Sequence, residues 1–168
     1  VWQGACYPFR EGLSTGILNL EFTPDGNLLC GGTNRGWPVR GIKPFALERL
    51  EWTGRMPFEI ERVSITPKGF DFTFTKPVDA VTGNDPKSYQ VSTFTHIYHA
   101  GYGGPEVDQT TPVVKAAKLS SDGLGATIEL DRLTLGHVHE FDLGALRSRD
   151  REELLHRHAY YTVNEVPK

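Results

Sequence analysis

The sequence predicts an all-β protein, in which an antiparallel sandwich follows a shorter β-meander, and three observations support this class. Runs rich in β-branched and aromatic residues recur along the whole chain, with short polar segments between them. The tetrapeptides TPDG, TPKG and SSDG lie between such runs, and each ends in the glycine that tight reversals favour. A helical pattern is restricted to Ser148–His158, where we expect a short helix.

The strand positions follow from these runs. Phe70, Phe72 and Phe74 alternate with polar residues, so their rings share one face of a strand. Tyr160 and Tyr161 are adjacent and therefore point to opposite faces. In chain order the expected strands are Ile17–Phe22, Asn27–Gly32, Phe45–Trp52, Phe58–Thr66, Phe70–Thr75, Ser88–His99, Val113–Ser120, Ala126–Asp131, His137–Leu143 and Ala159–Val166. The Gly-rich segment Tyr98–Pro112 is expected to be a loop.

A domain boundary is expected within Thr53–Pro57, which divides the chain into residues 1–53 and residues 54–168. The second part carries about seven short strands with frequent turn signals, a pattern typical of an immunoglobulin-like or fibronectin-like sandwich. Residues 22–37 show a strand, a tight turn, a strand and a long loop. This order is typical of one β-propeller blade.

A single blade cannot close a ring, because propellers contain about four or more blades. Two solutions stay open: the other blades belong to polypeptide outside this sequence, or the N-terminal strands extend the sandwich. We expect the first, since the sequence begins without Met and within a strand-like run, Ala5–Phe9, which would be the outer strand of a preceding blade. The expected partner is then the remainder of a larger propeller polypeptide or a second chain.

The segment FTFTKPVDAVTGNDPKSYQV, residues 72–91, resembles the Ig-like modules of secreted bacterial proteins. In those modules a strand ends in a Phe-Ser/Thr-x-Pro-Val/Met-Asp/Asn pattern, and a Tyr-x-Val/Leu strand follows. The residues that fit this pattern are Phe74, Pro77, Val78, Asp79, Tyr89 and Val91. His139 stands where such modules often carry Tyr. The resemblance implies a sandwich fold and is silent on function.

The segment GLSTGILNLEFTPDGNLLCGGTNRGW, residues 12–37, resembles a blade of the six-bladed glucose and sorbosone dehydrogenase propellers. The whole chain resembles the C-terminal region of large secreted proteins of planctomycete type, in which a propeller precedes an Ig-like module. The resemblance implies a periplasmic or extracellular location. It also implies quinone-dependent sugar dehydrogenase chemistry, with pyrroloquinoline quinone on blades outside this sequence and no catalytic residue within it.

Composition excludes two kinds of partner. The chain of 168 residues has a net charge of -3, so we expect no basic face for nucleic acid. With 38% hydrophobic residues it contains no apolar run long enough to span a membrane.

A ligand site is expected on the blade-like segment. In a β-meander, alternate connections emerge at the same end of the sheet, so the loops Arg10–Gly16 and Thr33–Pro44 should lie together, opposite the TPDG turn. Propeller ligands bind at such an end, near the central channel. The predicted substrate or cofactor contacts are Ser14, Thr15, Asn34, Arg35 and Trp37. The alternative is that these residues only fold a long loop.

The six histidines fall into three close pairs, of which His137 with His139 is the most suggestive. Residues two apart in a strand leave the same face, so this pair could chelate copper or zinc together with His156 and His158. The alternative is that the histidines lie in the core or in solvent and bind no metal.

Two further alternatives stay open. Cys6 and Cys30 could form a disulfide, or they could be two small buried thiols. The aromatic residues could build a flat carbohydrate-binding platform, or they could pack at the domain seam. The aromatic candidates are Trp2, Trp37, Trp52, Tyr98, Tyr102, Tyr160 and Tyr161.

Overall fold

The computed structural model describes residues 1–37 and 39–168, which form two compact units. One unit, the sandwich, contains Val1–Pro8 and Met56–Lys168, and the other contains Phe9–Arg55. The junction between Arg55 and Met56 lies inside the expected seam. The chain is all-β with antiparallel sheets, as predicted.

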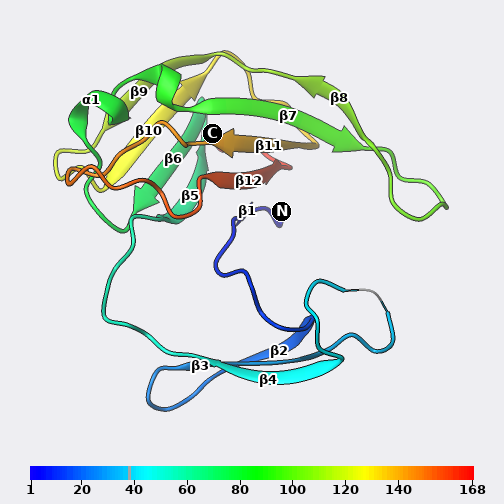
Figure 1. Ribbon diagram of the computed structural model, residues 1–168. Coiled ribbons are helices and arrows are strands. Elements are labelled where there is room, and N and C mark those ends of the chain that lie inside the picture. Colours follow the sequence, from blue (N-terminus) through cyan, green and yellow to red (C-terminus); the bar gives the residue numbers. More distant parts are fainter. Residues whose placement is uncertain (38) are drawn as a thin grey trace. The chain divides into compact units, whose positions relative to one another are not determined.

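The sandwich consists of two sheets (Figure 1). The five-stranded sheet has the order β1-β12-β11-β7-β8, and the four-stranded sheet has the order β5-β6-β10-β9. The first contains β1 Ala5–Cys6, β7 Gln90–His96, β8 Glu106–Thr110, β11 His137–Asp142 and β12 His158–Val163. The second contains β5 Ile60–Thr66, β6 Gly69–Phe74, β9 Val114–Leu119 and β10 Gly125–Leu130.

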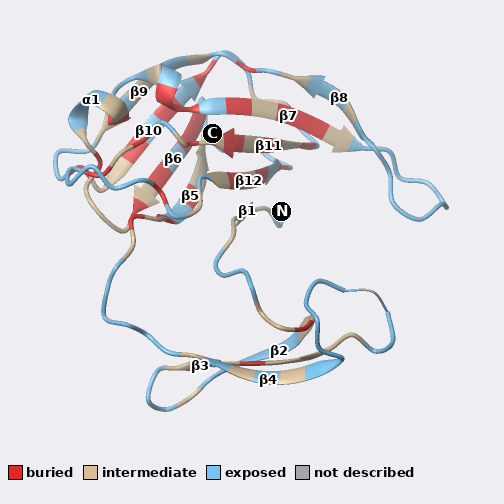
Figure 2. Ribbon diagram, viewed as in Figure 1, coloured by how far each residue is buried: buried red, intermediate tan, exposed pale blue. Residues whose placement is uncertain are grey.

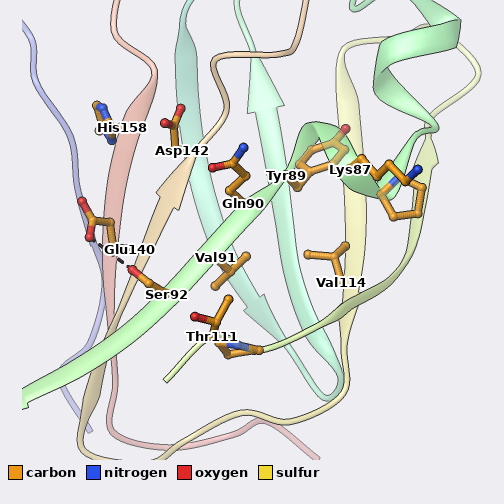
Figure 3. Close-up of a pocket in the computed structure, with 12 residues that line it drawn as sticks. Lys87, Tyr89, Gln90, Val91, Ser92, Thr111, Val114, Glu140, Asp142 and His158 are labelled. Atoms are coloured by element: carbon orange, nitrogen blue, oxygen red, sulfur yellow. Dashed lines mark hydrogen bonds between the residues drawn. The ribbon is translucent and has the colours of Figure 1, made fainter. Parts of the chain in front are cut away.

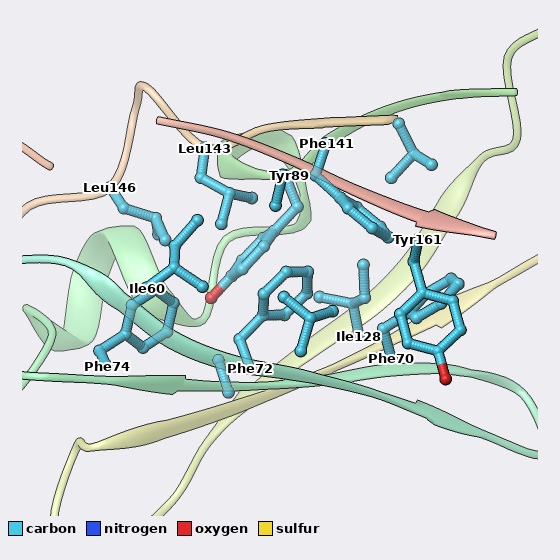
Figure 4. Packing of buried hydrophobic residues seen from close by; sticks show 14 of the residues in the cluster. Ile60, Phe70, Phe72, Phe74, Tyr89, Ile128, Phe141, Leu143, Leu146 and Tyr161 are labelled. Carbon is cyan, nitrogen blue, oxygen red and sulfur yellow. The ribbon is translucent and has the colours of Figure 1, made fainter. Parts of the chain in front are cut away.

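The core lies between these sheets and is rich in aromatic rings (Figures 2 and 4). Phe70, Phe72 and Phe74 are each at most 1% exposed, which confirms the alternation predicted for β6. The rings of Phe70 and Phe72 meet Phe141 of the facing sheet edge to face, with centroids 4.8 and 5.1 Å apart. Each such buried ring contributes roughly 1.5–3 kcal/mol to folding.

The N-terminal strand belongs to the sandwich. In β1, Ala5 pairs with Tyr161 and Cys6 with Tyr160 of β12. The Tyr7 hydroxyl also donates a hydrogen bond of 2.6 Å to the carbonyl of Glu61. The expectation that Ala5–Phe9 forms the outer strand of a preceding blade is therefore wrong, because the edge of β12 provides the pairing partner. Residues 1–8, expected in the N-terminal segment, join the second domain instead.

The helices are short and do not lie where the sequence pattern places one. They are α1, Ala80–Gly83, and the 3-10 helix η1, Pro86–Ser88. In the part of the chain that the structure describes, no helix has the length and apolar character needed to cross a bilayer.

The helix expected at Ser148–His158 is wrong. Arg151 adopts a positive φ of 68°, and Ser148 makes a bridge to Val78. The Ser148 hydroxyl accepts the Glu152 N–H at 3.0 Å, which stabilises a turn instead of a helix.

The sequence pattern does not reveal strand β8. The segment Tyr98–Pro112 is expected to be a loop, but β8 pairs with β7, with Val107 opposite Thr95 and a register shift between Thr93 and Thr95. The strand is hidden because Asp108 takes a positive φ of 54° and β8 contains a single apolar residue, Val107.

The unit Phe9–Arg55 is a three-stranded antiparallel sheet in the order β2-β3-β4. Its strands are β2 Ile17–Phe22, β3 Leu28–Thr33 and β4 Phe45–Leu50. Leu20, Cys30 and Glu48 lie opposite one another across the sheet, so they share one face. The Thr23–Gly26 turn joins β2 to β3, as predicted, and Gly26 has a φ of 80°.

Candidate functional site

Two rows of polar side chains cross the outer face of the five-stranded sheet (Figure 3). In antiparallel strands, residues directly opposite each other point to the same side of the sheet. Strand β11 lies between β7 and β12, so it supplies the central residue of each row, which is a carboxylate. The rows are Gln90, Asp142 and His158, and Ser92, Glu140 and Tyr160. Figure 3 labels all of these residues except Tyr160.

The alternation of β11 explains why the carboxylates point outward. His137, His139 and Phe141 are buried on the core face, whereas Glu140 and Asp142 are half-buried on the other face. The same segment thus builds the core and the polar rows, as period two requires.

Hydrogen bonds connect the rows internally. The Ser92 hydroxyl donates to Glu140 Oε2 at 3.2 Å. Arg157 donates from Nε to His158 Nε2 at 3.1 Å and pairs with Asp142 through Nη2 at 3.3 Å. His158 Nδ1 is buried without a hydrogen-bond partner in the described structure. Burial, and then the neighbouring Glu140 carboxylate, raise the pKa of Tyr160 above its ordinary value.

A cavity of about 700 Å³ adjoins the rows. Gln90, Ser92, Glu140, Asp142 and His158 line one side of it. The rest of the lining comes from Pro86, Lys87, Thr111, Pro112 and Val114, together with Tyr89 and Val91, which belong to the core and are 2% and 4% exposed. A second hollow of about 390 Å³ shares Ser92 and Glu140 with it and adds Glu106 and Gln109. The volume of the first cavity is within the range of small-molecule sites, roughly 300–1,000 Å³.

This arrangement suits a ligand rich in hydroxyl groups. Carboxylates accept hydrogen bonds from hydroxyls, while the Gln90 amide can donate as well as accept. The half-buried side chains of Pro86 and Val114 offer apolar surface for the carbon face of a ring.

The sequence contains a signal for the two carboxylates of this site, although neither is among the predicted site residues. The alternation in HVHEFDL, which predicts one face for His139 and Phe141, also places Glu140 and Asp142 together on the opposite face. Their partners Gln90 and Ser92 depend on the pairing of β11 with β7, which a sequence alone does not give.

The predicted ligand residues of the other unit do lie at one end of its sheet. Lys43 N–H donates to the Ser14 carbonyl at 2.9 Å, and Thr33 N–H donates to the Gly16 carbonyl at 3.0 Å. The loops Arg10–Gly16 and Thr33–Pro44 therefore lie together, opposite the Thr23–Gly26 turn. Ser14 and Thr15 line a cavity at this end.

Asn34, Arg35 and Trp37 lie outside that cavity lining and fold their own loop. Asn34 Oδ1 accepts the Gly36 N–H at 2.9 Å, and the Asn34 carbonyl accepts the Trp37 N–H at 2.7 Å. Trp37 is 73% exposed. These local bonds favour the loop-folding alternative for the three residues, and a ligand contact stays a prediction.

The four histidines of the expected copper or zinc site do not converge. His137 and His139 lie on the core face of β11, whereas His158 lies on the outer face of β12. His156 bonds to the Glu59 carboxylate at 2.5 Å. Among residues 1–37 and 39–168, no cluster of three or more His, Cys, Asp or Glu side chains could hold a metal ion.

The buried histidine pair instead belongs to the sandwich interior. His137 Nε2 lies 3.2 Å from Asp108 Oδ2, and His139 Nε2 accepts the Thr134 N–H at 3.4 Å. Both cysteines are free; Cys30 is buried and Cys6 is exposed.

Comparisons with known proteins give structural neighbours alone. No family model matches the chain, and no curated protein matches it in sequence. Three solved structures of the S-layer protein SbsC are similar to the chain. The crystal structure of residues 31–844 has 27% sequence identity over 67% of this chain, with a TM-score of 0.50. The structure of domains 1–6 has 25% identity over 68% of this chain, with a TM-score of 0.49. The structure of the N-terminal part of the bacterial protein has 27% identity over 67% of this chain, with a TM-score of 0.49. The chain spans 14%, 15% and 25% of these structures, respectively.

Proposed function

We propose that this chain is a non-catalytic module of a larger extracellular bacterial protein. In this role the Ig-like sandwich carries a three-stranded sheet that packs between other sheets. The observation that carries the proposal is the exposure of apolar side chains on both faces of that sheet. In this proposal the chain supplies no catalytic residue, since the propeller resemblance implies that dehydrogenase chemistry and its quinone lie mostly on other blades.

The register assigns the exposed side chains to their faces. Leu20 and Phe22, 59% and 70% exposed, lie on the face that carries Cys30. Phe45 and Leu47, each 74% exposed, lie on the opposite face. A sheet normally exposes one polar face, so apolar residues on both faces favour a layer between two neighbouring sheets, as in a propeller.

The extracellular location rests on the SbsC structure with a TM-score of 0.50 and 27% identity, an S-layer protein. The Ig-like motif of residues 72–91 supports the same location, because it resembles modules of secreted proteins.

Self-association of the isolated chain tests the assembly role. We expect the chain to bind a hydrophobic dye and to self-associate at micromolar concentration. The double substitution Leu20→Ser and Phe22→Ser should reduce both signals. Val81→Ser is the matched control, because Val81 is 76% exposed on α1 of the sandwich and should change neither signal. A wild-type chain that sediments as a monomer and binds no dye would contradict the proposal.

A second function, binding of neutral glycans on the outer face of the five-stranded sheet, is favoured by the two polar rows and the adjoining cavity. Titration with cellotetraose, maltotetraose and chitotetraose tests it. We expect one of them to bind, and Glu140→Gln or Asp142→Asn to weaken that binding. Glu129→Gln, an exposed position on β10, is the control. If none of the three binds at millimolar concentration, this second function is wrong.

A further inference from the structure

The unit Phe9–Arg55 contains a cavity of its own, of about 660 Å³, between the segments 10–17 and 40–42. The residues that line it include Arg10, Leu13, Ser14, Thr15, Arg40 and Ile42. The volume is within the range of small-molecule sites, roughly 300–1,000 Å³. It is separate from the polar rows of the sandwich.

The backbone that forms this cavity is fixed by the sheet. The Ser14 N–H donates to Glu48 Oε2 of β4 at 2.8 Å, and the Ser14 carbonyl accepts the Lys43 N–H. Gly41 has a φ of 106°, and a Cβ there would lie 2.5 Å from the Ser14 carbonyl oxygen. Only glycine allows this approach, so segment 40–42 closes tightly against Ser14 and Thr15.

Two hydroxyl groups in the lining have no partner. Ser14 Oγ and Thr15 Oγ1 are both buried and make no hydrogen bond within the described structure. Thr15 is only 3% exposed. Buried hydroxyls are nearly always hydrogen-bonded in folded proteins, so these two indicate a missing polar partner.

The charges of the lining favour an anion. Arg10 and Arg40 come from the two segments that bound the cavity, and neither takes part in a salt bridge found in the described residues. Glu11 also lines the cavity, so the lining keeps one positive charge in excess. Guanidinium groups match carboxylates in geometry as well as in charge.

We propose that this cavity binds a small carboxylate-bearing sugar. The guanidinium groups of Arg10 and Arg40 pair with the carboxylate, and the hydroxyls of Ser14 and Thr15 bond to the sugar hydroxyls. Leu13 and Ile42 cover the apolar side of the ring. The inference is independent of the assembly role, which concerns the faces of the sheet.

Calorimetric titration of the full chain at low salt, with D-glucuronate, D-glucose and inorganic phosphate as separate probes, tests the inference. We expect glucuronate to bind and glucose to show no binding. Arg40→Gln and Arg10→Gln should each weaken glucuronate binding about tenfold, as expected for loss of a charge-assisted bond. Thr15→Val, which keeps the shape of the side chain, should weaken it several-fold.

Two control variants accompany this test. Arg55→Gln removes an arginine of the same unit that does not line the cavity, so it should leave binding unchanged. Arg40→Lys keeps the charge and should retain part of the affinity, and circular dichroism should show each variant folded. Absence of glucuronate binding at millimolar concentration, or equal binding by Arg40→Gln and wild type, would overturn the proposal. Equal binding of glucose would overturn the carboxylate assignment, and equal Arg-dependent binding of phosphate would overturn the sugar assignment.

Discussion

The imidazole ring of His139 packs against the phenyl ring of Phe70 in the core, with ring centroids 5.4 Å apart and planes tilted by 54°. Its Nδ1 is buried without a partner in the described structure, and the residue is 0% exposed. Burial therefore lowers the pKa of His139 from 6.5 to about 4. A histidine thus occupies a position that an aromatic residue could fill.

This pKa predicts a loss of stability in mild acid. Above pH 6.5 the histidine is neutral in both the folded and the unfolded chain, and its contribution is constant. As the pH falls from 6.5 to about 4, the unfolded chain gains a proton that the folded chain excludes, so the free energy of unfolding decreases by roughly 3 kcal/mol. Below pH 4 this loss levels off. Chemical denaturation at several pH values measures it.

Substitution His139→Phe should remove most of this pH dependence. The variant should gain stability over wild type at pH 5 and differ much less at pH 8. His96→Gln, at an exposed position of β7, should keep the wild-type profile. Identical pH profiles for His139→Phe and wild type would show that another group governs the acid transition.

Tyr89 makes a buried hydrogen bond that predicts a measurable cost. Its hydroxyl donates to the Gly83 carbonyl at 2.8 Å, and the residue is 2% exposed. Tyr89→Phe leaves that carbonyl without its partner, so we expect a loss of about 1–2 kcal/mol in the free energy of unfolding. Urea denaturation measures it, with Tyr98→Phe, a fully exposed tyrosine, as the control. A loss equal to that of the control would mean that water replaces the bond.

Side-chain alternation could be predicted from the sequence, whereas long-range pairing could not. Phe70, Phe72 and Phe74 follow period two within one strand, and their burial is confirmed. The pairing of Ala5 with Tyr161 joins residues at opposite ends of the chain, and no local pattern reports it. The candidate site escapes prediction for the same reason, because Glu140 becomes part of a row only when β7 and β12 lie beside β11.

Local patterns also fail where tertiary contacts override propensity. Ser148–His158 has helix-forming residues, but Glu152 pairs with Lys76 at 2.6 Å and Leu154 is buried. These contacts, together with the positive φ of Arg151, hold the segment in an irregular turn.

The titration of Tyr160 reports on the polar rows. Burial and the Glu140 carboxylate both raise its pKa, so Glu140→Gln should lower the pKa toward the ordinary value of 10.0 while the burial effect persists. Ultraviolet absorbance of the phenolate over an alkaline titration measures this shift. Tyr160→Phe identifies the signal, and Glu129→Gln should leave it in place. An unchanged titration in Glu140→Gln would mean that Glu140 does not act on Tyr160.

Gly41 predicts a defect confined to the smaller unit. Its φ is 106°, and a Cβ at this position would lie 2.5 Å from the Ser14 carbonyl oxygen, so any side chain is unfavourable there. Gly41→Ala should therefore destabilise the unit Phe9–Arg55 by about 1–3 kcal/mol, while the sandwich keeps its own transition. Hydrogen exchange resolves the two units: we expect faster exchange in β2–β4 and unchanged protection in β6 and β10. Gly54→Ala is the matched control, because Gly54 also has a positive φ, of 78°, but has open space around its Cβ position. If exchange accelerates equally in both units, the two do not unfold independently; if Gly54→Ala has the same effect, backbone strain alone, and not the contact with Ser14, explains the requirement for glycine.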